Sequence, residues 1–181
     1  MNIEPVNIKG LLNENLFKGS IFLVITNPLF IPPHVGIAVD ENYTSLTLKG
    51  RDEFVSIKTL LRNAAIKQKP VVGLRINNET GLSLSQLEKM VSESFSQYDK
   101  VNPDGPTCLI PVLDFFGKAF GVKNMNIQYL FQLVPFLINK GWVEGVYATN
   151  ISDAFPDSKY YLKVYDAEQL KYAFFNLLFP N

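Results

Sequence analysis

The segment that constrains the fold most is the near-continuous apolar run Ser20-Ile21-Phe22-Leu23-Val24-Ile25-Thr26, which follows Gly19. A short apolar run bounded by a glycine is typical of a β-strand that is buried on both faces. The sequence therefore predicts a sheet whose central strand has no face in water.

The first half of the chain is predicted to be mainly sheet. Apolar and alternating segments separated by turn residues indicate successive strands, and a polar turn indicates a hairpin. We expect strands at 20–26, 33–39, 44–49 and 70–76, a hairpin turn at 40–43, an end of the hairpin at Gly50, and a short helix at 56–65.

The second half is predicted to be mainly helix. Apolar residues recur at helical spacing, and Ser85 with Glu88 fits a capping box at or near the start of the first helix. Pro135 lies inside the third helix and should kink or break it. We expect helices at 84–95, 108–120, 127–139 and 166–178, and strands at 143–147 and 160–165.

The last helix is apolar almost all round from Tyr172 to Phe179, and Gln169 stands three residues after Asp166, at its start. An all-round apolar helix favours burial, so we expect it to close the core. The alternative is a surface that contacts lipid or a partner.

Composition is typical of one globular domain, residues 1–181, since 47% of the residues are hydrophobic and 13% are aromatic. Seventeen basic residues balance seventeen acidic ones without a run of like charge, so nucleic acid is not an expected partner. No apolar run approaches the ~20 residues of a membrane span, and the N-terminus has no signal-peptide pattern. By default we expect a cytoplasmic location, and the oligomeric state stays open.

The chain has one cysteine and one histidine, and both stand where a thiol enzyme needs them. Cys108 follows Gly105-Pro106-Thr107 at the expected start of a helix, and His34 opens a strand. A helix N-terminus and a nearby imidazole favour the thiolate, so we expect a lowered pKa for Cys108.

Strand geometry predicts how these two residues meet. His34, Gly36 and Ala38 share one face, because side chains alternate along a strand. This nearly bare face would let the Cys108 helix approach closely. An even-numbered turn centred on 41–42 would pair Gly36 with Thr47 and Ala38 with Ser45. Thr47 would then lie diagonally from His34, in reach of the ring that it would orient.

The order of these elements resembles a known family. Residues 16 to 122 resemble the circularly permuted papain-like hydrolases. The shared features are the Gly-bounded strand, Pro-Pro-His-Val-Gly-Ile-Ala-Val at 32–39, its hairpin partner and a helix-starting cysteine. These hydrolases are relatives of the NlpC-type endopeptidases and include the YiiX-like bacterial proteins and lecithin:retinol acyltransferase. The chain departs from the family at Gly19-Ser20, where Gly-Asp is usual, at Leu109-Ile110, where Ser-Glu is frequent, and at Thr47, which brings no charge.

The resemblance implies an α+β papain-like fold, with a central antiparallel sheet and the cysteine-bearing helix packed on it. It also implies thiol-dependent hydrolysis or acyl transfer at an amide or ester bond of a peptide, a cell-wall peptide or a lipid. Cys108 would attack the carbonyl, His34 would carry the proton and Thr47 would orient His34. The Cys108 backbone N–H would contribute to an oxyanion hole.

No cofactor is implied, and no metal site is expected. The carboxylates of Asp52, Glu53, Asp153 and Asp157 have no second histidine or cysteine to complete a transition-metal site. Two other readings stay open. The first is a non-catalytic binding or scaffold module of the same fold. The second is a carrier that binds a hydrophobic ligand in the aromatic C-terminal half and keeps binding it when Cys108 is replaced.

Overall fold

The structure is a computed structural model that describes residues 3–122 and 126–178. Within these residues a seven-stranded mixed sheet has the order β2-β8-β7-β3-β4-β5-β6. The strands are β2 (Gly10–Leu11), β3 (Ile21–Thr26), β4 (His34–Val39), β5 (Asn42–Thr47), β6 (Gly50–Ser56), β7 (Val71–Ile76) and β8 (Val143–Ala148). Neighbouring strands are antiparallel except β2, which runs parallel to β8, so the sheet is not purely antiparallel.

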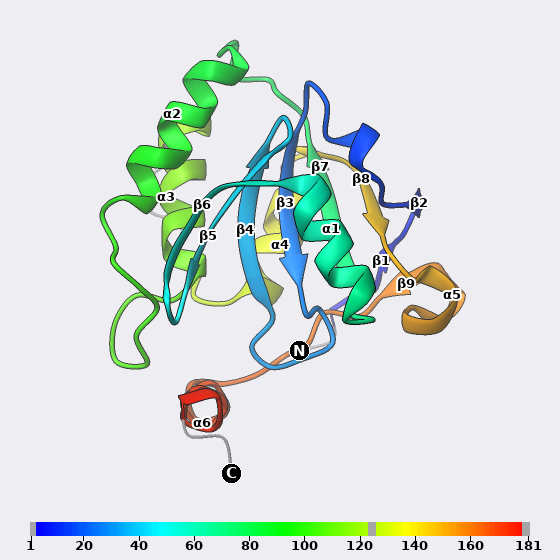
Figure 1. Ribbon diagram of the computed structural model, residues 1–181, viewed down its shortest axis with the longest axis vertical. Helices are drawn as coiled ribbons and strands as arrows, with labels where there is room; N and C mark the ends of the chain where they lie inside the picture. Colours follow the sequence, from blue (N-terminus) through cyan, green and yellow to red (C-terminus); the bar gives the residue numbers. More distant parts are fainter. Residues whose placement is uncertain (1–2, 123–125, 179–181) are drawn as a thin grey trace.

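Helices cover both faces of this sheet (Figure 1). They are α1 (Ile57–Ile66), α2 (Leu84–Phe95), α3 (Leu109–Phe120), α4 (Leu130–Asn139), the short α5 (Ile151–Ala154) and α6 (Ala167–Leu178). Two short 3-10 helices, η1 (Glu14–Leu16) and η2 (Pro156–Ser158), and a small sheet of β1 (Val6–Asn7) with β9 (Lys159–Tyr160) complete the regular structure of the described residues.

The predicted central strand is confirmed as β3, and its two faces belong to two different clusters. Ile21, Leu23 and Ile25 pack with residues of α2, α3 and α4. Phe22 and Val24 pack on the opposite face, toward α1. All five side chains are fully buried, which is why this segment contains no polar alternation.

The β4–β5 hairpin is confirmed, but its register differs from the prediction by two residues. Gly36 pairs with Ser45 and Ala38 with Tyr43, so the turn is only Asp40 and Glu41. Asp40 adopts a left-handed conformation with φ 53°, and its carboxylate accepts the Gly19 N–H. This conformation allows a two-residue turn, and β5 therefore begins earlier than alternation alone indicated.

The strand β6 was not predicted. Gly50 does not end the hairpin but takes φ 140°, a conformation that favours glycine, and pairs with Thr47 across a second tight turn. The strand that follows is exposed over most of its length and rich in charged residues, as edge strands often are. It has no apolar alternation that would reveal it in the sequence.

Helix starts are set by reciprocal side-chain caps. The first long helix of the second half, α2, begins at a capping box of Ser83 and Gln86, so the predicted Ser85–Glu88 box is wrong. The predicted start of α6 is confirmed, because Asp166 and Gln169 each accept the other's backbone N–H.

Two other predictions in the second half need correction. Helix α4 begins at Leu130, three residues later than expected, and continues through Pro135 without a break. The expected strand at 160–165 is regular only over Lys159–Tyr160, where β9 pairs with β1. Residues 161–166 have no regular structure and lead away from the sheet to α6 (Figure 1).

Helix α6 does not close the core as a buried helix. Phe174 is buried, but Tyr172 is 70% and Leu177 57% exposed. The prediction rested on composition, and a helix that is apolar all round can meet the protein along only one stripe. Residue Phe179 lies outside the described residues. No helix in the described part of the chain is long and apolar enough to cross a membrane.

Candidate functional site

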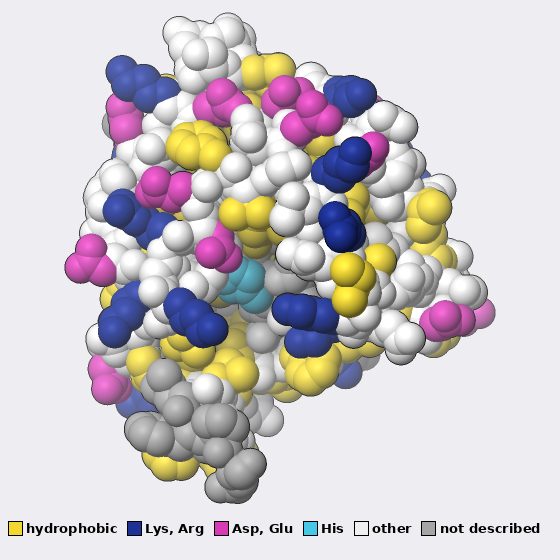
Figure 2. All heavy atoms as spheres, viewed as in Figure 1, with side chains coloured by type: hydrophobic (Ala, Val, Ile, Leu, Met, Phe, Trp, Pro, Cys, Tyr) yellow, Lys and Arg dark blue, Asp and Glu magenta, His cyan; other side chains and the backbone are white. Residues whose placement is uncertain are grey.

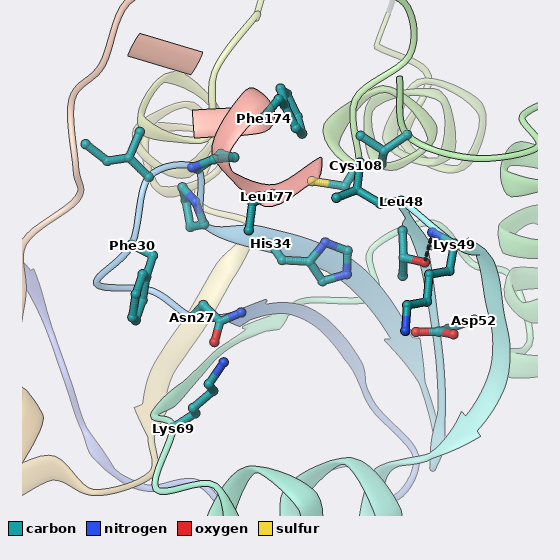
Figure 3. Close-up of a pocket in the computed structure, with 15 residues that line it drawn as sticks. Asn27, Phe30, His34, Leu48, Lys49, Asp52, Lys69, Cys108, Phe174 and Leu177 are labelled. Atoms are coloured by element: carbon teal, nitrogen blue, oxygen red, sulfur yellow. Dashed lines mark hydrogen bonds between the residues drawn. The ribbon is translucent and has the colours of Figure 1, made fainter. Parts of the chain in front are cut away.

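A cavity of about 530 Å³ lies at the end of the sheet where β4 begins (Figure 3). Its volume falls in the range of small-molecule sites. The three residues predicted from the sequence all line it: Cys108, His34 and Thr47. The remaining lining residues are Asn27, Phe30, Ile31, Pro32, Pro33, Leu48, Lys49, Asp52, Lys69, Val101, Phe174 and Leu177.

The cavity opens where β4 and β5 separate. His34 still pairs with Thr26 of β3, but the ladder between β4 and β5 ends at Gly36 and Ser45. Beyond this pair, the carbonyl of Thr47 accepts the backbone N–H of Val101 instead of bonding to β4. The first residues of β4 therefore have no partner strand on that side, and groups from both faces of the sheet can reach the same space.

The prediction that the Cys108 helix would pack on the His34 face is wrong. Helix α3 packs on the opposite face, with Val35 and Ile37. The small-residue face is filled from β5 instead: a Cβ added to Gly36 would lie 2.6 Å from Cε2 of Tyr43. The bare face therefore accommodates the Tyr43 ring and does not admit a helix backbone.

Cys108 stands at the N-cap of α3, and the backbone of Val35, the residue after His34, is close enough to influence the pKa of its thiol. Burial raises the Cys108 pKa from 9.0 to about 11, although backbone hydrogen bonds from Val35 and Cys108 itself act to lower it. The predicted lowering of this pKa is therefore wrong, because desolvation outweighs the helix terminus and the hydrogen bonds.

The His34 ring is neutral near pH 7. Burial lowers its pKa from 6.5, and the nearby charge of Asp52 acts in the opposite direction. In Figure 3 the sulfur lies on one side of β4 while the ring points toward the side of the cavity that holds Asp52. Within the described residues, no direct hydrogen bond joins the thiol to the ring. Near pH 7 the cavity therefore holds a neutral thiol and a neutral imidazole.

Thr47 lines the cavity, but its hydroxyl is already used in the β5–β6 turn. It donates to the carbonyl of Gly50 at 2.9 Å and accepts the backbone N–H of Lys49 at 3.2 Å. A hydroxyl has one proton and two lone pairs, so one lone pair stays available for a ring N–H.

Asp52 is the site residue that the sequence reasoning missed. It lies on β6 opposite Ser45 and places a carboxylate near His34. The only signal in the sequence for this position is the second hairpin. The chain turns tightly at Gly50, and the strand after the turn runs back past Thr47, so that Asp52 reaches the cavity. Without β6, Asp52 was considered only as a metal ligand. The described residues contain no cluster of three or more histidine, cysteine or acidic side chains that could hold a metal ion.

Two buried hydroxyls of the β4–β5 hairpin have no hydrogen-bond partner in the part of the chain that the structure describes. They belong to Tyr43 and Ser45, which share the face of the hairpin that carries Gly36. Ser45 lies close enough to act on the pKa of Tyr43, which burial raises, but the two oxygens do not reach hydrogen-bonding geometry. Each buried unpaired hydroxyl costs about 1–3 kcal/mol. This part of the hairpin is therefore not optimised for stability.

Comparison of the chain with protein-family models, with curated proteins and with solved structures found no match. Arguments about function therefore rest on the cavity and on the residues that line it.

Proposed function

We propose that this protein is a thiol-dependent hydrolase or acyltransferase that acts on an amide or ester bond, with Cys108 as nucleophile and His34 as base. One observation carries the proposal. The chain's only cysteine, at a helix N-terminus, and its only histidine, at the start of a strand, line the same cavity although 73 residues separate them. The cavity has the size of a substrate site and not of a packing defect.

The reaction begins with a neutral pair. Cys108 Sγ bonds to the substrate carbonyl carbon while its proton passes to His34. The bond from that carbon to the leaving oxygen or nitrogen then breaks, and the leaving group takes the proton from His34. Water or an acceptor amine or alcohol attacks the resulting thioester and gives its proton to His34. The bond from carbon to sulfur then breaks, the sulfur takes that proton back from His34, and the acid or the transferred acyl product leaves.

The raised Cys108 pKa and the lowered His34 pKa favour general-base catalysis over a preformed ion pair. When His34 takes the proton, the imidazolium forms in a buried place and needs a nearby negative charge. Asp52 supplies this charge, and Thr47 offers a lone pair to the ring N–H. The Cys108 backbone N–H at the start of α3 is the candidate oxyanion-hole donor once the sulfur is bonded to the carbonyl carbon.

The permuted papain-like fold belongs to the same proposal. It is supported by the order of histidine before cysteine, by the antiparallel strands from β7 to β6, and by the packing of α3 on the sheet. The parallel β2 extends the far edge of the sheet and does not contact the cavity.

The alternative is a non-catalytic binding module of this fold. The observation that favours it is the protonated thiol, because a Cys108 pKa of about 11 leaves almost no thiolate near pH 7. A catalytic site needs His34 to remove the thiol proton, and a binding module does not.

Intact-mass spectrometry after incubation with p-nitrophenyl acetate tests the proposal. We expect one acetyl group on the wild-type protein, none on Cys108→Ala, and much slower addition on His34→Ala. Asp52→Asn should slow acylation more than Thr47→Val, because only the first removes a charge. Acylation of His34→Ala at the wild-type rate would contradict catalysis and leave the binding module.

A further inference from the structure

One wall of the cavity is apolar. Four apolar side chains gather along α6 and the loop before β4: Phe30, Ile31, Phe174 and Leu177. Phe30 and Leu177 are also more than half exposed, so this apolar wall continues to the surface. An apolar chain bound here would lie against side chains from two separate segments and would leave water on both.

Beside Phe30, this wall meets a lysine that lies on the side of the cavity away from the Asp52 carboxylate. Lys69, which follows α1, and Asn27 lie together on the side of the cavity away from Asp52 (Figure 3). Lys69 Nζ lies 6.0 Å from the centre of the Phe30 ring, and among the described residues it makes no ion pair. The second lysine of the lining, Lys49, lies on the Asp52 side instead.

The surface shows the same arrangement. Figure 2 shows His34 at the bottom of a hollow, with basic side chains on both sides and hydrophobic side chains below. An anion in this hollow can reach the Lys69 ammonium group and the Asn27 amide N–H₂, which line the same cavity as the imidazole. Both are donors suited to carboxylate or phosphate oxygens.

We propose that the substrate of this site is an anionic amphiphile. Its carboxylate or phosphate group binds Lys69 and Asn27, its apolar chain lies along Phe174 and Leu177, and its reacting carbonyl lies at Cys108. This inference rests on the proposed function for the position of the carbonyl, but the binding preference follows from the cavity alone. A neutral or cationic amphiphile of equal length lacks the contact with Lys69.

Isothermal titration calorimetry with four ten-carbon probes tests the preference without any turnover: decanoate, decyl phosphate, decanol and decylamine, each below its micelle concentration. We expect decanoate or decyl phosphate to bind about tenfold more tightly than decanol, as one charge-assisted contact allows. Comparing the two anions shows which group the site prefers. Decylamine should bind most weakly.

Matched variants locate the anion. Lys69→Gln should reduce the ratio of anion affinity to decanol affinity to near one. Lys67→Gln should keep this ratio, because Lys67 is an exposed lysine two residues away that does not line the cavity. Asn27→Asp should weaken binding of the anions and leave decanol binding unchanged. Residue 27 has φ 53°, which aspartate also tolerates.

Equal affinity for decanoate, decyl phosphate and decanol in the wild-type protein would overturn the inference. An equal loss of the anion preference in Lys69→Gln and Lys67→Gln would also overturn it. Measuring Cys108→Ala separates this result from the fate of the proposed function. If that variant keeps the anion preference while the wild-type thiol never acylates, the cavity is a binding site for anionic amphiphiles and catalysis fails. If the thiol acylates without an anion preference, only the substrate class is wrong.

Discussion

Replacing Gly36 with alanine tests how the His34 face of the sheet is filled. An added Cβ would lie 2.5 Å from the carbonyl oxygen of Thr44, 2.6 Å from the Tyr43 ring and 2.8 Å from the Ser45 Cβ. All three distances are shorter than real carbon contacts, and the carbonyl belongs to the backbone of the neighbouring strand, so it cannot move aside cheaply. The hairpin would have to shift or β4 and β5 would have to separate further.

Overpacking of this kind costs about 1–3 kcal/mol of unfolding free energy. For a chain of this size we expect Gly36→Ala to lower Tm by roughly 3–10 °C. Thermal melts followed by circular dichroism measure this, with Gly10→Ala as the control, because a Cβ at Gly10 meets nothing within 4 Å. Equal Tm values for the two variants would refute the packing of Tyr43 over Gly36.

Three further predictions concern the buried groups around the cavity. Tyr43→Phe should stabilise the protein by about 1 kcal/mol in urea melts, because it removes an unpaired buried hydroxyl; a loss of stability would show that the hydroxyl has a partner. Since burial raises the Cys108 pKa from 9.0 to about 11, the unfolded chain releases this proton first, and the wild-type protein should lose about 2 kcal/mol between pH 9 and 11 that Cys108→Ala does not lose. A pH dependence that is the same in both proteins would contradict a buried thiol. Since burial lowers the His34 pKa, the unfolded chain binds the imidazole proton first as the pH falls. The stability of the wild-type protein should therefore fall as pH drops below 6.5, and the stability of His34→Asn should fall less over the same range. Parallel stability curves for the two proteins would contradict a neutral, desolvated ring.

The sequence predicted those parts of the fold that local signals determine. The apolar run at β3, the small residues of β4 and the helical spacing of α3 each identify an element without knowledge of its neighbours. These elements place His34 and Cys108, and both residues line one cavity.

Other features depended on contacts that a single sequence does not reveal. The face that α3 covers and the register of β5 follow from tertiary packing of Tyr43 and from the conformation of Asp40. The charged edge strand β6 has no hydrophobic pattern, so Asp52 could not be placed beside His34. Burial also outweighs the helix N-terminus in setting the Cys108 pKa, and burial is a property of the folded chain.

The pH dependence of Cys108 acylation by p-nitrophenyl acetate tests the central claim most directly, because it reports which group removes the thiol proton. If His34 is the base, the wild-type rate rises as the ring loses its proton below pH 6.5 and is flat from about pH 7 to 9. In His34→Ala the rate should instead be low at pH 7 and climb toward pH 11 with the thiol itself. A wild-type rate that climbs continuously through pH 9, parallel to that of His34→Ala, would show that Cys108 reacts without His34 and would contradict the account.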